Sequence, residues 1–361
     1  METAVTPITD YRKEFNELIG ITVAENASDL HLSPGYHPTI RVSGTLLPLA
    51  KKNPLANKDI DEFLKAILTK EQLDRFSREQ ELDFSYSHTD GNRFRGNAAL
   101  QRGLTIITFR LIPKALRTIA ELGLPPVLET FAQKRQGFFL VVGPVGQGKS
   151  TTLAALIDYI NTYRSEHIIT IEDPIEYLFA PKQSIIHQRE VGVDTKDFHS
   201  ALISAFRQDV NVIMVGEMRG ADTISAAVTA AETGHLVLST LHTNSASQTI
   251  DRIIDSFPEH QQDQIRMQLA SSLAGIFSQR LVHRIAGGMV PAYELLINTK
   301  AVANMIREKR THEINTVIET SSEEGMISMN ASLAELIRRG EVSVEHAFAV
   351  AVDPKDLERL L

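Results

Sequence analysis

A glycine-rich octapeptide, GPVGQGKS at residues 143–150, most constrains what this chain can fold into. It matches the phosphate-loop pattern GxxxxGK[ST] at every fixed position. The apolar run 138–142 precedes it, as a buried strand would, and apolar residues at helical spacing follow it. The three glycines let the backbone turn tightly so that N–H groups converge, and the positive end of the following helix adds to the attraction for phosphate. The segment therefore predicts a strand–loop–helix unit that binds nucleoside triphosphate.

The residues of this loop have roles that follow from their chemistry. Lys149 is expected to reach the outer phosphates, and the Ser150 hydroxyl is expected to ligate Mg²⁺. ATP and Mg²⁺ are thus the expected ligands. The expected nucleotide-binding residues are Gly143, Pro144, Val145, Gly146, Gln147, Gly148, Lys149, Ser150 and Thr151.

Composition limits the other classes of function. The chain has 361 residues, enough for two domains, and its hydrophobic and charged fractions of 43% and 23% are those of an ordinary globular protein. It contains no cysteine, which excludes disulfides, thiol nucleophiles and cysteine zinc clusters. The net charge of -8 gives no sign of nucleic-acid binding, and no apolar run approaches the ~18 residues of a membrane span. The N-terminus lacks the basic start and apolar core of a secretion signal, so a cytosolic setting is expected.

Two domains are expected from the change of pattern along the chain. Residues 1–112 alternate helical segments with short strands bounded by turn residues, which predicts a small α+β domain. Residues 113–122 form the predicted linker, and residues 123–361 form the second domain. In the first domain, helices are predicted at 11–19 and 59–68, and strands at 28–32, 39–42, 84–86, 93–100 and 104–111.

Short apolar runs alternate with helical segments in the second domain. The runs 168–171, 212–215 and 236–238 are too short for buried helices and suit central strands covered on both faces. This alternation predicts the α/β class. Beyond Pro291 we expect the chain to be helical, with helices at 301–309 and 331–338.

Two of these apolar runs lead into carboxylates. The run 212–215 leads into Glu217, which we expect to polarise the water that attacks the terminal phosphorus. The alternative is that Glu217 is a solvated acid at the end of a strand. The run 168–171 leads into Glu172 and Asp173. Neighbouring strand residues face opposite sides, so both acids can serve one metal only if the strand has ended there, which Pro174 favours. We expect Glu172 to act on Mg²⁺ or on water with Asp173 in support, and a simple Asp-Pro turn is the alternative.

Two histidines, His235 and His242, stand at the two ends of the third apolar run. Beside a nucleotide site such a pair suits a phosphate sensor, and a structural role is the alternative. A zinc pair is disfavoured because no other histidine or acid stands nearby at metal-ligand spacing.

Arginines in both domains are candidates for stabilising the charge of phosphoryl transfer. Arg93, Arg95 and Arg110 lie on predicted strands of the first domain, where a solvated face is the simplest interpretation. An arginine lent across a subunit boundary can nevertheless accelerate phosphoryl transfer by ~10³–10⁵. Three more arginines lie in the second domain, where they could act within the subunit or hold loops by ion pairs: Arg189, Arg207 and Arg219.

Five motifs resemble, in this order, those of the PilT-type retraction ATPases of type IV pili, within the superfamily of hexameric secretion motors. They are an N-terminal signature, a Walker A region, an aspartate box, a Walker B segment and a histidine box. Here they are ASDLHL (27–32), GPVGQGKSTTLAALIDYIN (143–161), ITIEDPIEY (169–177), VIMVGEMR (212–219) and TGHLVLSTLHTNSA (233–246). The resemblance covers nearly the whole chain.

The resemblance implies a PAS-like α+β N-terminal domain followed by a P-loop, RecA-like ATPase domain with a helical C-terminal end. It implies a homohexamer that hydrolyses ATP to ADP and phosphate between neighbouring subunits, beneath an inner-membrane platform protein. Its work would be pilin disassembly, and so pilus retraction and twitching motility. The protein would be cytoplasmic and associated with the inner membrane only through the pilus machine, with no direct membrane insertion and no nucleic acid.

The resemblance also implies roles for single residues. Lys149 and Ser150 would bind phosphate and Mg²⁺, and Glu217 would be the catalytic acid. The aspartate-box roles fall to Glu172 and Asp173, and the histidine-box roles to His235 and His242. Of the arginines, Arg95 and Arg110 fall where the family's inter-subunit arginines stand.

Some residues depart from the family pattern. Val145 and Gln147 replace the usual Thr and Ser of the loop, but binding is expected to survive because the loop acts through backbone N–H groups. In the C-terminal signature AVANMIRE (301–308), Ala303 replaces an arginine, which bears on retraction more than on ATPase activity.

Other functions remain as alternatives. An accessory retraction ATPase, or a pilus-assembly or type II secretion ATPase, is the nearest. The lack of a four-cysteine zinc module and of a longer N-terminal region favours retraction. A non-hydrolysing nucleotide-binding scaffold is a remote alternative, and a DNA-translocating ring is disfavoured by the net acidity and the absence of tryptophan.

Overall fold

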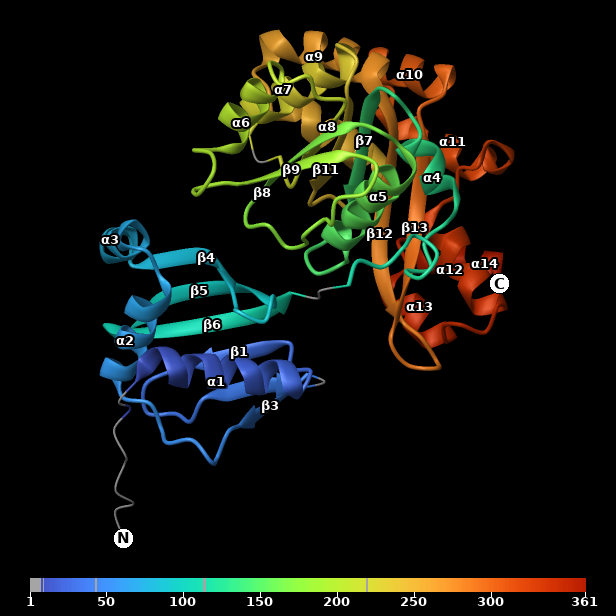
Figure 1. Cartoon of the computed structure of the whole chain (residues 1–361). Helices are drawn as coiled ribbons and strands as arrows, with labels where there is room; N and C mark the ends of the chain where they lie inside the picture. The colour runs from blue at the N-terminus through green and yellow to red at the C-terminus, as the bar shows by residue number, and fades with distance from the viewer. Residues whose placement is uncertain (1–7, 9, 43, 113–114, 219) are drawn as a thin grey trace. The chain divides into compact units, whose positions relative to one another are not determined.

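The computed structural model describes residues 8 and 10–361 apart from 43, 113–114 and 219 (Figure 1). The chain separates by its internal contacts into two units. The first comprises Met1–Ala115 with Pro174–Leu178, and the second comprises Leu116–Asp173 with Phe179–Leu361. A linker over residues 113–122 stays a prediction, and its residues 113 and 114 lie outside the described part of the chain.

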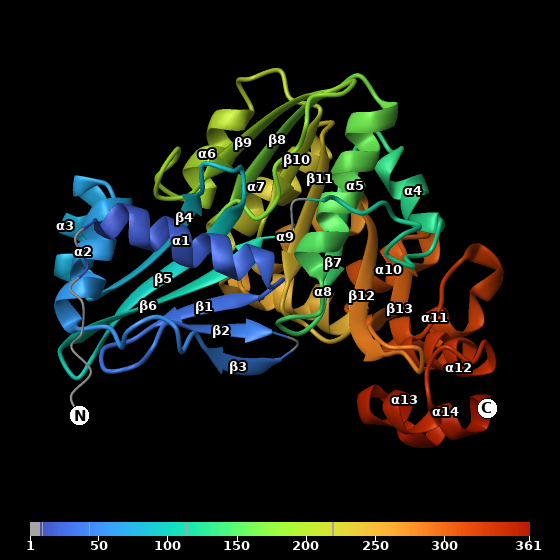
Figure 2. The same ribbon diagram turned by 60° about the horizontal axis from the view of Figure 1, so that its bottom comes forward.

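The first unit is an antiparallel sheet covered by helices on one face (Figure 2). Its strand order is β3-β2-β1-β6-β5-β4. Alternate residues of β6, among them Ile107 and Phe109, are buried against Phe15 and Phe63 of the helices, whereas Arg110 is exposed. The elements are α1 (Tyr11–Ala24), β1 (Asp29–Leu32), β2 (Thr39–Val42), β3 (Thr45–Pro48), α2 (Asn57–Ile67), α3 (Lys70–Glu79), β4 (Glu81–Ser87), β5 (Arg93–Gln101) and β6 (Leu104–Ile112).

The predicted elements of this unit all occur, and two more were missed. Strand β3 is short, exposed along its whole length and at the edge of the sheet, so it lacks the apolar alternation that marks a strand. Helix α3 has only two apolar residues, Leu73 and Phe76, and neither is fully buried, so the apolar pattern in its sequence is short.

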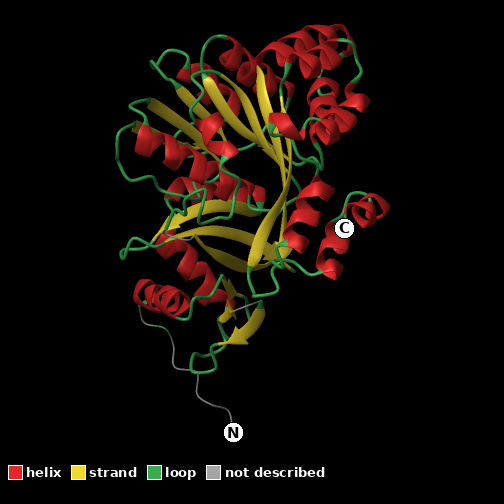
Figure 3. Cartoon of the chain, turned by 90° about the vertical axis from the view of Figure 1, so that its right-hand side faces the viewer, coloured by secondary structure: helices red, strands yellow, loops and turns green. Residues whose placement is uncertain are grey.

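The second unit is built on a seven-stranded sheet with the order β13-β12-β7-β11-β10-β8-β9. Figure 3 draws the strands of the chain in yellow and the helices in red. All neighbours pair in parallel except β12 and β13, which form an antiparallel hairpin at one edge. The strands are β7 (Gly137–Val142), β8 (His167–Glu172), β9 (Ile185–Glu190), β10 (Val212–Val215), β11 (Leu236–Leu241), β12 (Leu273–His283) and β13 (Met289–Ile297). The predicted α/β class is confirmed.

Helices cover both faces of this sheet, which explains why its central strands are continuous apolar runs. In β7, Phe139 and Val141 pack towards α4 (Val127–Ala132) and α5 (Lys149–Tyr163). The other side chains of β7 pack against helices of the opposite face. Those helices are α6 (Phe198–Ala205), α7 (Ala221–Glu232), α8 (Ala246–Asp255), α9 (Glu259–Ser272), α10 (Lys300–Arg307) and α11 (Ile314–Thr320).

The C-terminal part corrects one expectation. The chain is not helical from Pro291 onward, because Pro291 lies within β13 opposite Leu281. Proline lacks the N–H of a central strand but is tolerated in β13, which lies at the sheet edge. Three helices then pack around a separate small core at the end of the hairpin: α12 (Met329–Arg338), α13 (Val344–Val350) and α14 (Pro354–Leu360). No helix of the described residues is both long and apolar enough to cross a membrane.

Candidate functional site

The strand order gathers the predicted site residues at one edge of the large sheet. The phosphate loop follows β7, His242 follows β11, Glu217 comes two residues after β10, and Glu172 ends β8. Since the spatial order of these parallel strands is β7-β11-β10-β8, their carboxyl ends present the same sequence of groups along the edge. His242 is therefore placed between the loop and Glu217, although it comes last along the chain.

The phosphate loop connects β7 to α5, as predicted. Its glycines Gly143, Gly146 and Gly148 have φ values of 145°, 78° and 78°, a region that favours glycine. Gly148 also precedes the first turn of α5, and no side chain caps that helix. The N–H groups of this turn therefore stay available to an anion.

Lys149 folds back over the loop and is buried, with 7% of its surface exposed. Its Nζ donates to the carbonyl oxygens of Gly143 and Pro144, both at 2.8 Å. Burial lowers the pKa of Lys149, and the negative charge of Glu217 partly offsets that effect. The same ammonium lies 3.2 Å from Nδ1 of His242.

This contact determines the tautomer of His242. An ammonium group only donates hydrogen bonds, so Nδ1 must accept and the proton of a neutral ring lies on Nε2. Nε2 faces Oε2 of Glu217 at 3.7 Å. Lys149, His242 and Glu217 thus form a continuous row of donor and acceptor groups from the phosphate loop to the predicted catalytic acid.

Glu172 lies one strand further along the edge and is held by two residues that the sequence interpretation missed. Its Oε1 accepts from the Thr170 hydroxyl at 2.6 Å and from Nε2 of Gln188 at 3.1 Å. Thr170 shares a strand face with Glu172, and Gln188 is the register partner of Thr170 on β9. Thr170 could have been predicted, because residues two apart on a strand lie on the same face. Gln188 could not, because nothing in the local sequence shows that β9 pairs with β8. Asp173 follows the strand and is exposed.

The predicted magnesium ligands offer the oxygen donors that Mg²⁺ prefers. Ser150 is an exposed residue in the first turn of α5, and Glu172 offers a buried carboxylate. The roles of Ser150 and Glu172 as Mg²⁺ ligands stay predictions. Across the described residues, no three His, Cys, Asp or Glu side chains converge as metal ligands.

The two predicted histidines are not brought together. His235 and His242 stand at opposite ends of β11, about 23 Å apart for an extended strand. His235 Nδ1 contacts the Ala230 carbonyl at 3.0 Å, and its own carbonyl accepts from Gly137 N. A strand carries its two ends to opposite edges of the sheet, so only His242 lies at the edge that holds the phosphate loop. The role of His235 stays a prediction.

Arg93, Arg95 and Arg110 lie on the face of the first unit's sheet that points away from its helices. Arg95 and Arg110 are register partners, with Arg95 4.0 Å from Asp83 and Arg110 donating to Asp29 at 2.9 Å. The third, Arg93, donates to the Ile175 carbonyl at 3.5 Å.

Of the arginines predicted for the second domain, one has a clear local role. Arg189 donates to the Asp194 carbonyl at 3.1 Å and so holds the turn that follows β9. Arg207 follows α6, and Arg219 lies outside the described residues.

The segment after His242 is fixed by two residues of the β12–β13 hairpin, which sequence patterns did not reveal. Ser278 donates to the Asn244 carbonyl at 3.0 Å, and Glu294 accepts from the Ala246 N–H, at the start of α8, at 2.7 Å. The two residues are register partners. Burial raises the pKa of Glu294, despite this hydrogen bond and the nearby Arg280.

Glu294→Gln is expected to stabilise the protein above neutral pH, by about 1 kcal/mol, the usual size of a buried polar effect. An acid whose pKa is raised on folding holds its proton more tightly when folded, so stability falls as pH rises from the ordinary 4.5 through the raised pKa. Glutamine cannot ionise and escapes this loss. Urea unfolding at pH 5 and pH 8 should show a larger advantage of the variant at pH 8. An equal difference at both pH values would contradict the assignment.

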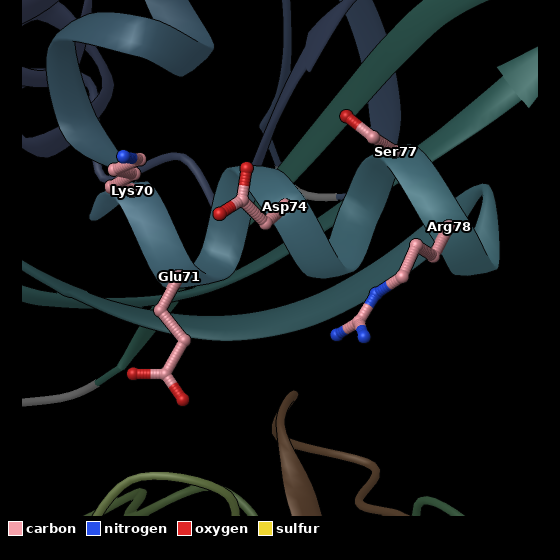
Figure 4. Close-up of a pocket in the computed structure, with 5 residues that line it drawn as sticks. All are labelled: Lys70, Glu71, Asp74, Ser77 and Arg78. Carbon is pink, nitrogen blue, oxygen red and sulfur yellow. The ribbon is translucent and has the colours of Figure 1, made fainter.

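A shallow hollow of about 710 Å³ lies elsewhere, along α3 of the first unit (Figure 4). Its lining residues are all polar and all belong to α3: Lys70, Glu71, Asp74, Ser77 and Arg78. It contains none of the predicted site residues.

Comparison with known proteins assigns the chain to a family. The model of the family described as "Type II/IV secretion system protein" matches residues 12–337. The chain belongs to this family. It is 42% identical to a type IV pilus retraction ATPase, PilT, of Pseudomonas aeruginosa, over 95% of this chain and 99% of that protein. It is 38% identical to the type IV pilus ATPase PilU of the same organism, over 96% and 91% of the two chains.

Solved structures of this family agree. A crystal structure of the pilus retraction motor PilT with bound ADP has a TM-score of 0.89 and 43% identity, covering 95% of this chain and 98% of that one. The family resemblance inferred from the five motifs is therefore confirmed.

Proposed function

We propose that this protein is an ATPase that converts ATP and water to ADP and phosphate and uses the energy to retract type IV pili. The observation that carries the proposal is the row Lys149–His242–Glu217 beside an open helix N-terminus, in a chain similar along its length to a retraction ATPase. Phosphoryl transfer needs a held triphosphate, neutralised charge and an aligned water. The residues of the row provide these functions.

In this proposal the phosphate loop and Lys149 hold the β- and γ-phosphates. Lys149 exchanges the carbonyls of Gly143 and Pro144 for phosphate oxygens, and Ser150 would hold Mg²⁺, which would neutralise phosphate charge. Glu217 accepts a proton from the attacking water. His242 lies next to both groups, so it senses whether Lys149 is engaged with phosphate. Glu172 would act on Mg²⁺ or on the attacking water, with Asp173 in support.

The assembly in this proposal is a homohexamer on the cytoplasmic side of the inner membrane, docked on the pilus platform protein. Arg95 or Arg110 of one subunit would reach the nucleotide of its neighbour. The PilT structure supports nucleotide binding by this fold, since it contains ADP. Hydrolysis would change the angle between the two predicted domains, a hinge motion of the usual kind.

An accessory retraction ATPase is the second candidate, because identity to PilU, at 38%, is only slightly lower than to PilT, at 42%. An accessory motor would leave some retraction when it is removed. The buried position of Ala303 in α10, at 7% exposure, shows that its small side chain packs in the core and does not itself choose between the two.

Deletion of the gene tests the direction of force. Loss of a retraction motor is expected to increase the number of surface pili several-fold and to abolish twitching, as counted by electron microscopy and measured on agar. The native gene should restore twitching, and a Lys149→Ala copy should not. Lys182→Ala is the matched control, since Lys182 pairs with Asp158 of α5 at 2.7 Å, outside the loop.

The other outcomes distinguish the alternatives. Cells without pili would overturn retraction in favour of assembly. More pili with partial twitching would indicate the accessory role. Unchanged pili and unchanged twitching would contradict both pilus functions.

A further inference from the structure

The phosphate loop is attached to strand β12 by a set of hydrogen bonds that the proposed mechanism does not use. Gln279, 3% exposed, donates from Nε2 to the Gln147 carbonyl at 2.7 Å. Its Oε1 accepts from the Thr152 hydroxyl at 2.7 Å. In return, Oε1 of Gln147 accepts from the Leu281 N–H at 2.7 Å. We call Gln147, Thr152, Gln279 and Leu281 the loop clamp.

The chemistry of the clamp requires an amide at position 279. The Gln147 carbonyl only accepts, so the NH₂ group of Gln279 must face it, and the Gln279 oxygen must then face the Thr152 hydroxyl. A carboxylate cannot donate to Gln147, and an aliphatic side chain can do neither. The side chain thus ties the middle of the loop and the first turn of α5 to one point on β12.

The backbone of the loop also closes on Gln279. A Cβ on Gly143 would lie 2.4 Å from the Gln279 carbonyl oxygen, which cannot move aside within a strand. A Cβ on Gly148 would lie 3.0 Å from Nε2 of Gln279. Both ends of the loop therefore pack on the same residue. The parallel pairing of β7 with β12 ends at Val142 and Ser278, so Gln279 is the first residue of β12 beyond it.

We propose that Gln279, together with Gln147, holds the phosphate loop in the shape that binds nucleotide. Gln279 acts through the loop, so it is a positioning residue and not a catalytic one. Its effect reaches Lys149 because Lys149 donates to Gly143, which rests on Gln279. Without the clamp the loop samples other shapes, and the apparent Kd equals the intrinsic Kd divided by the fraction of molecules that remain competent to bind.

The test rests on the proposed function and uses the purified full-length chain with Mg²⁺ and a fluorescent ATP analogue, mant-ATP. Gln279→Met keeps the length of the side chain and removes both of its hydrogen bonds. It is expected to raise the Kd of mant-ATP and the KM for ATP about tenfold, which corresponds to about 1.4 kcal/mol. The kcat is expected to change less than twofold, because Glu217 and His242 are untouched. Gln147→Ser, which cannot reach Leu281, should raise Kd about threefold.

Gln279→Glu tests whether the hydrogen bond donated by Gln279 to the Gln147 carbonyl is needed. Its carboxylate faces the Gln147 carbonyl and cannot donate, whereas the protonated acid can. Position 279 is 3% exposed, and burial of this kind is expected to raise the pKa of the new carboxyl into the range tested. The ratio of the variant's Kd to that of the native chain should therefore fall at least threefold between pH 8.5 and pH 6. Val282→Ala is the control for a weakened strand: Val282 lies on β12, is 2% exposed and packs in the C-terminal core. Its Kd should stay within twofold of native.

The possible results distinguish a failure of the clamp proposal from a failure of the proposed function. If the native chain does not bind mant-ATP, the proposed function fails. If the native chain binds and folded Gln279→Met binds equally well, only the clamp is overturned. Should Gln279→Met not fold, native affinity in Gln147→Ser together with a pH-independent Gln279→Glu ratio would overturn it.

Discussion

Lys149→Ala is expected to lower kcat/KM for ATP at least 100-fold, the usual loss when one donor to a transferring phosphate is removed. Lys149 is the charged residue of the loop 143–150, and it is predicted to reach the outer phosphates. Its Nζ donates across the loop to the carbonyl oxygens of Gly143 and Pro144. Alanine removes this charge while the N–H groups of the loop remain. Phosphate release by the purified protein with Mg²⁺ measures the effect.

Two comparisons make this result interpretable. Thermal unfolding shows whether the variant still folds, since alanine also removes the hydrogen bonds of Lys149 within the loop. Lys182→Ala removes a lysine that pairs with α5 through Asp158 and should keep turnover within twofold of native. Full activity of folded Lys149→Ala would refute the assigned site.

Glu217→Gln is expected to lower kcat by 10²–10⁴, the contribution of a positioned general base. Glutamine has the same shape but cannot take a proton from water. Nucleotide binding should persist, because the loop and Lys149 are unchanged. The variant is thus expected to bind mant-ATP with a Kd within threefold of native while releasing almost no phosphate.

The matched control for this variant is Glu232→Gln. Glu232 ends α7 and accepts hydrogen bonds from Gln268 and Ser271, away from the carboxyl edge of the sheet. Its turnover should remain near native. Loss of nucleotide binding in Glu217→Gln would mean that Glu217 supports the loop structurally, and unchanged turnover would remove it from the mechanism.

His242 connects these two predictions. It contacts Lys149 at 3.2 Å and faces Glu217 at 3.7 Å, so a change at either neighbour alters its hydrogen bonding. Because Nδ1 accepts from an ammonium, the neutral ring carries its proton towards Glu217. This arrangement supports the proposal that His242 reports the engagement of Lys149 to the catalytic acid.

The local parts of the site could be predicted from the sequence because their contacts are local. Lys149 binds carbonyls five and six residues earlier, and the glycines of the loop lie between a buried strand and its helix. Length and apolar continuity also identified β8, β10 and β11, since strands covered on both faces must be apolar along their whole length. The α/β class followed from these features.

Sequence patterns failed where the apolar signal was weak or ambiguous. The hairpin β12–β13 contains Ser278, Gln279 and Glu294 among its buried residues, so it did not stand out as a strand pair. The proline within β13 also argued for the end of a strand. Both exceptions arise because this hairpin forms the sheet edge and its buried polar groups bind neighbouring loops.

The sequence by itself determined that the chain holds a phosphate loop between a buried strand and a helix, and which acids and histidines end its strands. Only the tertiary structure decided which of them meet. The order β7-β11-β10-β8 puts His242 between Lys149 and Glu217. The pairing of β12 with β7 brings Gln279 against a loop more than a hundred residues earlier. Strand order depends on how the connections between strands run and on how segments distant in sequence pack together. The local periodicity of a sequence gives no information about which strands become neighbours in the sheet.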